Sequence, residues 1–486
     1  MSSSIAAAAA VRADSLYVGG EWIPSTTSER LEVRNPYDLG LVGSAPDGSA
    51  ADVDAAVRAA RSAFDRGPWP RLSPAERAAW LERLADELER RGADTAALVT
   101  AQNGQPIGMS RVLSGIVPAT HLRYYAGLAR GFESEEIREN VSFPGSTVVR
   151  HEPVGVCGLI VPWNYPQSLL SAKLAPALAV GCTVVVKPAG ETPLDARAFA
   201  DAADAIGMPP GVINIVTGGR DTGRALVDHP GVDKIAFTGS TAAGRAIAAR
   251  CGERLIPVTL ELGGKSAAIV LDDADAAQTL AQLQSLSFMN SGQTCFLLSR
   301  VLVPHARLDE FTEGLGDVAR GLVLGDPLDE ATQQGPLVSE RIRSRVRSLV
   351  DAGAAAGARI VTGGRDAPDL DGYFYEPTVV TGVEPRDALA QEEVFGPVVT
   401  ILGYGSDQEA VDLANDTVYG LGGAVFSGDD ERALDVARRI ETGTIGINGY
   451  RPDIGSPFGG YRASGLGREH GPEALANYVK IKAVYR

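Results

Sequence analysis

The stretch VGVCGLIVPWNYP (residues 154–166) contains an apolar, β-branched run that stops at a proline-rich turn. An alanine- and leucine-rich segment follows at 167–180, and a second β-branched run, TVVVK, follows at 183–187. A helical segment over 193–206 and a third run, VINIV (212–216), continue the series. Strands that alternate with helices in this way predict a doubly wound parallel sheet of the α/β class.

The alternation extends in both directions from this stretch. Residues 234–237 are strand-like and precede a helix near 242–251, and a second α/β unit is expected after residue 271, with a junction near 257–270. Toward the N-terminus, the spacing of apolar residues predicts a helix over 52–64. Ser73-Pro-Ala-Glu76 is a capping box that begins another helix, for which Gly92 is a candidate C-terminal cap.

Size and charge exclude several classes of protein. A chain of 486 residues is too long for one core and suits two or three domains. Its 61 acidic and 45 basic residues give a net charge of −16, and the basic residues are scattered, so nucleic acid and anionic membrane partners are not expected. No run reaches the roughly 20 apolar residues that cross a bilayer. The alanine tract at 5–10 is interpreted as a frayed tail rather than a targeting segment.

The four cysteines are too sparse for a disulfide framework or a zinc site, because no two of them have CxxC spacing. The five histidines are dispersed as well, so no metal site is predicted. A reducing, cytoplasmic location is expected, with one reactive thiol.

Cys295 is the candidate nucleophile. It closes the small, polar stretch Asn290-Ser-Gly-Gln-Thr-Cys295, which lies between apolar segments. A helix starting near Gly292 would stabilise a thiolate through its dipole and its free N–H groups. The alternative interpretation is a buried structural cysteine.

Two further side chains suit catalysis. Glu261 is flanked by leucines where a strand-like run breaks at two glycines, and an apolar setting would raise its pKa toward that of a general base. A surface ion pair is the alternative. Asn164 follows the strand at 156–161, at the sheet edge where ligands bind, and its amide could donate to an oxyanion or serve only a local turn.

A glycine-containing loop joins a strand to a helix over 237–244 and could hold phosphate on backbone N–H groups, although it lacks the GxGxxG pattern. Lys187 ends a strand at the same sheet edge and could reach a ribose or phosphate. Each of these signals is weak when taken alone.

Together the motifs resemble the aldehyde dehydrogenase superfamily, in the family's order, from about residue 15 to the end. The carriers of the resemblance are Pro-Trp-Asn (162–164), Glu-Leu-Gly-Gly-Lys (261–265), Gly-Gln-x-Cys (292–295), Glu-Glu-Val-Phe-Gly-Pro (392–397) and Pro-Phe-Gly-Gly-Tyr-Arg-x-Ser-Gly (457–465).

The resemblance implies an NAD(P)-dependent oxidation of an aldehyde to a carboxylic acid. Cys295 would attack the aldehyde, Asn164 and the Cys295 N–H would stabilise the oxyanion, and Glu261 would activate the water that hydrolyses the thioester. Glu469 would assist proton relay. The residues implied for cofactor binding are Ile160, Pro162, Trp163, Lys187, Gly219, Gly223, Phe237, Gly239, Ser240, Gly244, Leu262, Glu393 and Phe395.

The family's fold implies two Rossmann-like domains and a small β arm. Residues 12–129 and 150–260 would form the NAD(P)-binding domain, and 261–455 the catalytic domain. Segments 130–149 and 473–486, which look like strands without a helical partner, would form an oligomerisation arm. The expected assembly is a homodimer or homotetramer.

Two departures from the family pattern bear on specificity. Many NAD-preferring relatives have glutamate at the third position after the lysine, where this chain has Gly190, followed by Glu191. NAD is expected, with NADP possible. The second departure is that Phe296-Leu-Leu298, after the nucleophile, is bulkier and more apolar than the alanine-containing version common in the family, and the loop 450–454 lacks an obvious match. Phe296 and Phe458 suit an apolar or aromatic aldehyde, whereas Arg451 suits an acidic semialdehyde, and the sequence leaves both open.

Three rival functions remain at this point. A thiol esterase or acyl transferase would use the same nucleophile without a redox cofactor, but the nucleotide motifs argue against it. A CoA-acylating dehydrogenase is disfavoured by Glu261 as a water-activating base. A catalytically silent binding protein on this fold is disfavoured by the intact set of Cys295, Glu261 and Asn164.

Overall fold

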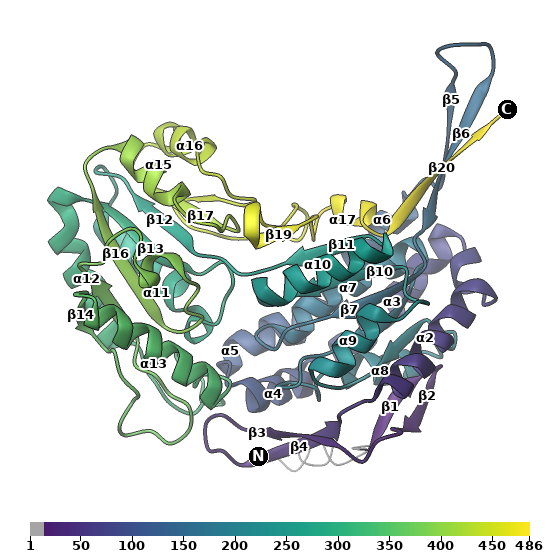
Figure 1. Cartoon of the computed structure of the whole chain (residues 1–486), viewed down its shortest axis with the longest axis horizontal. Coiled ribbons are helices and arrows are strands. Elements are labelled where there is room, and N and C mark those ends of the chain that lie inside the picture. Colours follow the sequence, from purple (N-terminus) through teal and green to yellow (C-terminus); the bar gives the residue numbers. More distant parts are fainter. Residues whose placement is uncertain (1–13) are drawn as a thin grey trace.

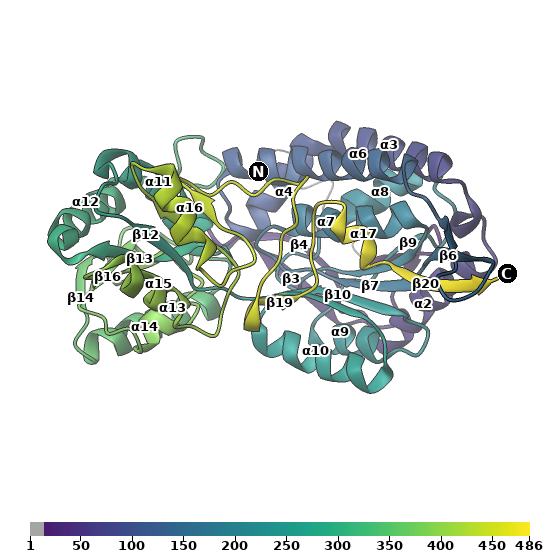
Figure 2. The same cartoon turned by 90° about the horizontal axis from the view of Figure 1, so that it is seen from above.

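The computed structural model describes residues 14–486, which form two lobes and a projecting arm (Figure 1). The alanine tract at 5–10 and the first two residues of the expected cofactor-binding region lie outside the described residues. Figure 2 shows the same two lobes side by side, with the last strand of the chain in the arm.

The first lobe is built on an eight-stranded sheet. Its strand order is β19-β11-β10-β7-β8-β9-β1-β2, and the five strands from β11 to β9 are parallel. The bounds are β1 (Ser15–Val18), β2 (Glu21–Pro24), β7 (Val156–Ile160), β8 (Thr183–Lys187), β9 (Ile213–Ile215), β10 (Lys234–Thr238), β11 (Val258–Glu261) and β19 (Gly465–Leu466).

Helices cover both faces of this sheet, as the doubly wound prediction requires. Cys157 and Leu159 of β7 pack with one group of helices: α3 (Pro74–Arg90), α6 (Val117–Arg130), α7 (Pro166–Val180) and α8 (Arg197–Ala205). The alternate residues Val156 and Ile160 pack with α2 (Ala50–Asp65), α9 (Arg220–Asp228) and α10 (Thr241–Arg254). The α/β fold class is therefore confirmed.

The N-terminal helical signals are correct in one case and wrong in another. Both reciprocal bonds of the Ser73 capping box form, and Pro74 is the first residue of α3. Gly92 is not a C-terminal cap: it begins α4 (Gly92–Asn103), with Arg91 between the two helices. A Cβ at position 92 would lie 2.6 Å from the Gly115 carbonyl oxygen, so close approach of two backbones explains this glycine.

The second lobe contains a seven-stranded sheet in the order β14-β15-β16-β13-β12-β17-β18. Its strands are β12 (Ser266–Val270), β13 (Leu298–Pro304), β14 (Arg359–Thr362), β15 (Thr378–Thr381), β16 (Val398–Tyr404), β17 (Gly423–Phe426) and β18 (Gly446–Ile447). The accompanying helices are α11 (Ala276–Phe288), α12 (Leu308–Gly321), α13 (Glu340–Ala355), α14 (Ala388–Gln391), α15 (Asp407–Asn415) and α16 (Asp430–Arg438). The second unit thus starts at β12, before residue 271, and only residues 262–265 separate it from β11.

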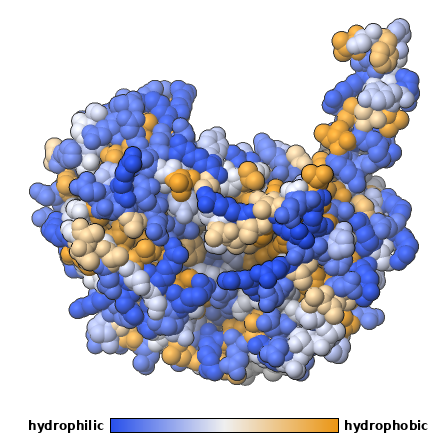
Figure 3. All heavy atoms as spheres, in the orientation of Figure 1, coloured by the Kyte–Doolittle hydropathy of each residue, from blue (hydrophilic) through white to orange (hydrophobic). Residues whose placement is uncertain are grey.

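The arm is a three-stranded antiparallel sheet of β5 (Glu135–Glu139), β6 (Ser146–Pro153) and β20 (Val479–Tyr485). The segments 130–149 and 473–486, for which the sequence shows no helical partner, therefore belong to one sheet, in which β20 pairs with β6. Figure 3 shows apolar residues along this arm, and the exposed ones are Ile137, Val141, Phe143, Ile481, Val484 and Tyr485. A separate hairpin of β3 (Arg30–Arg34) and β4 (Leu41–Pro46) and the short helices α5 (Ile107–Ser110) and α17 (Glu473–Ala476) complete the elements named in Figure 1.

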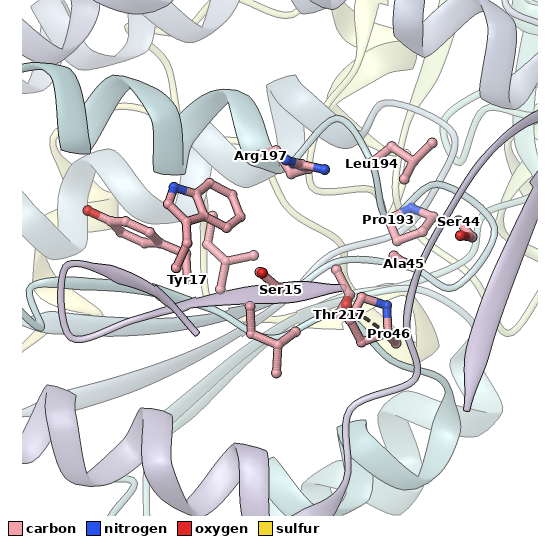
Figure 4. A pocket seen from close by; sticks show the side chains of 12 residues that line it. Ser15, Tyr17, Ser44, Ala45, Pro46, Pro193, Leu194, Arg197 and Thr217 are labelled. Carbon is pink, nitrogen blue, oxygen red and sulfur yellow. Dashed lines mark hydrogen bonds between the residues drawn. The ribbon is translucent and has the colours of Figure 1, made fainter. Parts of the chain in front are cut away.

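A small cavity lies between the N-terminal strands and the segment that leads into α8 (Figure 4). Tyr17, Leu194 and Arg197 line it, and the Thr217 hydroxyl in its wall donates to the Pro46 carbonyl at 2.7 Å. None of the candidate catalytic side chains borders this cavity. Within residues 14–486, no helix is both long and apolar enough to cross a membrane.

Candidate active site

The carboxyl ends of four parallel strands carry a row of candidate side chains. Ile160, Lys187 and Glu261 are the last residues of β7, β8 and β11, and Thr238 is the last residue of β10. Thr238 is in register with Glu261, and Ile160 is in register with Lys187. Because the strands are parallel, these residues meet at one edge of the sheet, where ligands bind in open α/β folds.

The loop that carries Cys295 differs from the prediction. Helix α11 ends at Phe288, and a short turn over Met289–Gly292 follows, in which Asn290, Ser291 and Gly292 all have positive φ. No helix starts at Gly292, so the predicted helix dipole does not act on the thiol. A Cβ at Gly292 would lie 1.8 Å from the Gly396 carbonyl oxygen, which shows that close packing imposes this left-handed turn.

The loop containing Asn164 is joined directly to the Cys295 loop. The Asn164 amide donates to the Gln293 carbonyl at 2.9 Å, and the Tyr165 hydroxyl lies 2.5 Å from the Thr294 hydroxyl. Asn164 is buried, and its Nδ2 retains a second N–H beyond the bond to Gln293. The amide is therefore fixed to the backbone two residues before Cys295, with one N–H left for a substrate oxygen.

Cys295 is half-buried, and its thiol is free. The three other cysteines are buried, and their thiols are free as well. Burial raises the pKa of its thiol well above the usual range, and the nearby carboxylates of Glu393 and Glu261 raise it further. A Cβ at Gly264 would lie 2.3 Å from the Cys295 carbonyl oxygen, so glycine is required where the Glu261 segment passes the nucleophile loop.

Glu261 is 3% exposed, and neither carboxylate oxygen has a hydrogen-bond partner within the described chain. Burial raises the pKa of Glu261 well above its ordinary value, and Glu469 raises it further, while Lys173 and Arg468 act in the opposite direction. An unpartnered buried carboxyl group of this kind accepts a proton readily, as a general base must.

Lys173 and Glu469 form a buried ion pair whose charges act on Glu261. Lys173 of α7 contacts the Glu469 carboxylate and donates to the Thr238 hydroxyl at 2.6 Å. The side chain of Lys173 is fully buried, and that of Glu469 is 5% exposed. The sequence analysis missed Lys173, although the only charged residue of the buried helix Pro166–Val180 is a signal that could have found it.

The start of α10 has the features of a phosphate-binding helix terminus. Ser240 caps the helix, with its hydroxyl accepting from the Ala243 N–H at 3.3 Å. A Cβ at Gly239 would lie 2.5 Å from the Phe237 ring, and one at Gly244 would lie 2.4 Å from Leu262. The two glycines thus add no side chain to the first turn of the helix, which fits a pyrophosphate on its N–H groups.

The next strand edge supplies a lysine and a second glycine-lined helix. Lys187 is buried and donates to the carbonyls of Pro188 and Gly218 at 2.7 and 2.6 Å, and burial lowers its pKa to about 8. Gly219 caps α9, and a Cβ at Gly223 would lie 3.4 Å from the Lys187 side chain. This arrangement fits a nucleotide ribose and phosphate beside the ammonium group.

The second lobe contributes Glu393 and Phe395 at the opposite side. The Gly264 N–H donates to the Glu393 carboxylate at 3.1 Å, and burial raises the pKa of Glu393 to about 7. The ring of Phe395, a residue with φ of +60°, lies edge-on to Trp163 with centroids 5.4 Å apart. Pro162 precedes Trp163 in the loop after β7, so both lobes enclose the same edge of the sheet.

The departure at Gly190 has a structural counterpart that the sequence did not reveal. A Cβ at Gly190 would have no neighbour closer than 3.8 Å. Glu191 forms an ion pair at 3.0 Å with Arg341, a residue 150 positions away. An arginine that is distant in the sequence therefore lies close to this segment.

An aromatic cluster borders the nucleophile loop. Phe296 lies 5.2 Å from the Tyr450 ring and 6.1 Å from the Phe458 ring, and Phe458 lies 5.7 Å from the His470 ring, as measured between centroids. Arg451 is exposed. The rings give the residue after Cys295 an apolar environment.

Comparisons with known proteins agree with this geometry. The model of the aldehyde dehydrogenase family matches residues 22–484. Geranial dehydrogenase of Castellaniella defragrans is 48% identical over 470 residues, which cover 97% of this chain and 98% of that protein. An aldehyde dehydrogenase of Mycobacterium tuberculosis, solved with NAD+, is 44% identical with a TM-score of 0.95, over 97% of this chain and 98% of that one. Betaine aldehyde dehydrogenase of Staphylococcus aureus, also solved with NAD+, is 35% identical with a TM-score of 0.96, over 100% of this chain and 97% of that one. The chain therefore belongs to the aldehyde dehydrogenase family, whose members are oxidoreductases that convert aldehydes to carboxylic acids with NAD(P)+.

Proposed function

We propose that Cys295 is the nucleophile and Glu261 the general base of this aldehyde oxidation. The observation that carries the proposal is a buried Glu261 carboxylate, without a hydrogen-bond partner in the described chain, whose charge acts on the Cys295 thiol. Cys295 adds to the aldehyde carbon and forms a thiohemiacetal. Asn164 and the Cys295 N–H stabilise the oxyanion, since the amide is held beside the nucleophile loop by its bond to Gln293.

When bound, NAD(P)+ accepts the hydride that converts the thiohemiacetal to a thioester. Glu261 then takes a proton from the water that attacks the thioester, which releases the carboxylic acid and restores the thiol. Glu469 lies behind Glu261 and is paired with Lys173, so this pair is proposed to receive that proton and pass it on.

The cofactor is proposed to bind across the edge of the first sheet. Gly239, Ser240 and Gly244 would hold the pyrophosphate with Phe237 and Leu262 beneath. The remaining contacts fall into two groups. Lys187, Gly219, Gly223, Ile160, Pro162 and Trp163 would surround the adenosine, and Glu393 and Phe395 would face the nicotinamide ribose. On this proposal residues 12–129 and 150–260 form the NAD(P)-binding domain and 261–455 the catalytic domain.

The first test separates the two chemical steps. With NAD+ and an aldehyde, Glu261→Gln should form reduced cofactor equal to about one equivalent of enzyme and then stop, because the thioester cannot be hydrolysed. Cys295→Ala should form none. Cys251→Ser and Glu253→Gln, which change a thiol and a carboxylate outside the site, serve as matched controls. A steady rate in Cys295→Ala would disprove the assignment.

An apolar aldehyde is the proposed substrate class, because Phe296, Tyr450 and Phe458 border the nucleophile loop. The relative that is 48% identical is a geranial dehydrogenase, which is consistent with this class. A higher kcat/KM for an acidic semialdehyde than for a medium-chain or terpenoid aldehyde would overturn the proposal and favour Arg451 as a carboxylate anchor.

A homodimer or homotetramer is proposed to form through the arm of residues 130–149 and 473–486. Within residues 14–486, the edge strands β5 and β20 are unpaired on their outer sides, and Phe143, Ile481 and Tyr485 expose 60%, 70% and 76% of their surface. Light scattering of Ile481→Lys should give a smaller particle than that of the unaltered protein.

We also propose a reducing compartment such as the cytoplasm, because all four thiols are free.

A further inference from the structure

A second small cavity lies in the other lobe, behind the nucleophile loop. Lys265 and Ser266 at the start of β12, Arg300 of β13, and the segment from Tyr419 to Gly422 line it together with Thr442. The cavity offers about 10 Å³, which is roughly the space that one water-sized molecule or ion needs. A Cβ at Gly264 would lie 3.3 Å from the Leu421 side chain, so the cavity wall touches the segment that packs against Cys295.

Three buried polar atoms at this cavity have no hydrogen-bond partner within the described chain: Lys265 Nζ, Ser266 Oγ and Thr442 Oγ1. Lys265 is 2% exposed and Ser266 is 3% exposed. All three groups are hydrogen-bond donors, and an unsatisfied buried donor is costly. Natural structures keep such groups only where a ligand, a water or a functional requirement compensates for them.

The charges around the cavity are also unbalanced. Arg300 uses its guanidinium to donate to the carbonyls of Lys265, Leu413 and Ala414 at 2.8–2.9 Å, so no carboxylate neutralises it directly. Burial lowers the pKa of Lys265 to about 7, with Arg300 lowering it further, and Glu393 and Glu392 raise it. Burial lowers the pKa of Arg300 to about 10, against the opposing charge of Asp416.

We propose that this cavity is a binding site for one small monovalent anion of halide size, chloride being the physiological example. The Lys265 ammonium and the Ser266 and Thr442 hydroxyls would hold it. An anion accepts from all three donors and balances the ammonium charge. A water molecule could also bond all three groups, because the hydroxyls accept as well as donate, but it carries no charge to balance the ammonium.

The test combines crystallography with thermal unfolding. Crystals of the protein grown in sodium bromide should contain an anomalous scattering peak in this cavity. In solution at pH 6.5 and constant ionic strength, replacing gluconate by chloride should raise the melting temperature in a saturable way. Above the pKa of the amine, the apparent chloride affinity should fall about tenfold per pH unit, because binding requires the protonated lysine.

Lys265→Met should abolish both the bromide peak and the chloride effect, whereas the exposed Lys480→Met serves as the matched control. If Lys265→Met does not fold, the double variant Ser266→Ala, Thr442→Val removes two donors without burying a new charge. It should weaken chloride binding at least tenfold. A water molecule in the cavity at high bromide, equal melting temperatures in gluconate and chloride, or a chloride effect that persists in Lys265→Met would each overturn the proposal.

Discussion

Gly264→Ala should disable the enzyme while leaving it folded. The added Cβ would lie 2.3 Å from the Cys295 carbonyl oxygen, whereas real Cβ contacts are essentially never shorter than 3.0 Å. The nucleophile loop must therefore move by about 0.7 Å. Because a misplacement of about 1 Å can cost on the order of 100-fold in rate, we expect kcat to fall by roughly that factor, about 2.7 kcal/mol of barrier.

The assay is the initial rate of cofactor reduction at saturating aldehyde, read by near-ultraviolet absorbance. Urea unfolding is measured in parallel, since overpacking typically costs about 1–3 kcal/mol. Gly252→Ala in α10 is the matched control, because its Cβ would meet nothing within 4 Å; it should keep full activity and gain about 0.5–1 kcal/mol. A Gly264→Ala enzyme with kcat within threefold of the parent would refute the reasoning.

Three other predictions follow from particular contacts. Lys173→Met removes a positive charge that lowers the pKa of Glu261, so this pKa should rise in the variant. Because the basic form of Glu261 exists above its pKa, the rising limb of the pH–kcat profile should move to higher pH. An unchanged limb would contradict the coupling between Lys173 and Glu261. Gly190→Glu adds a carboxylate beside the proposed ribose site, at a position where a Cβ would make only ordinary van der Waals contacts. The ratio of kcat/KM for NAD+ over NADP+ should therefore rise at least tenfold, whereas Glu191→Gln, which releases Arg341, should lower it. Ser73→Ala removes a helix cap and should cost about 1 kcal/mol in urea unfolding without affecting kcat.

Local patterns predicted the first sheet well. The run TVVVK coincides with β8 from Thr183 to Lys187, because β-branched residues bounded by turn-forming ones leave little alternative to a buried strand. The helix over 242–251 became the longer α10 (Thr241–Arg254). Its N-terminal boundary was nearly correct, since Ser240 supplies a local capping signal.

Features that depend on distant contacts could not be predicted in this way. The turn at Asn290 has a left-handed backbone because Gly292 packs against Gly396, which lies about a hundred residues later in the chain. Lys173 and Glu469 are 296 positions apart, and no sequence pattern near either residue indicates that the two form a pair. Recognition of the family motifs supplied Glu469, but the buried partner that holds it became visible only in three dimensions.

The proposed base and nucleophile belong to different lobes. Glu261 ends the last long strand of the first sheet, whereas Cys295 lies three residues before β13 of the second, and the covalent link between the sheets at this point is residues 262–265. Any hinge motion between the lobes therefore changes the distance from carboxylate to thioester directly. Thioester formation needs Cys295 and Asn164, which are tied together by the Gln293 carbonyl, so it would tolerate such motion better than hydrolysis does. Substitutions that loosen the short link without displacing the Cys295 loop should accordingly appear as enzymes that acylate at a normal rate but turn over slowly.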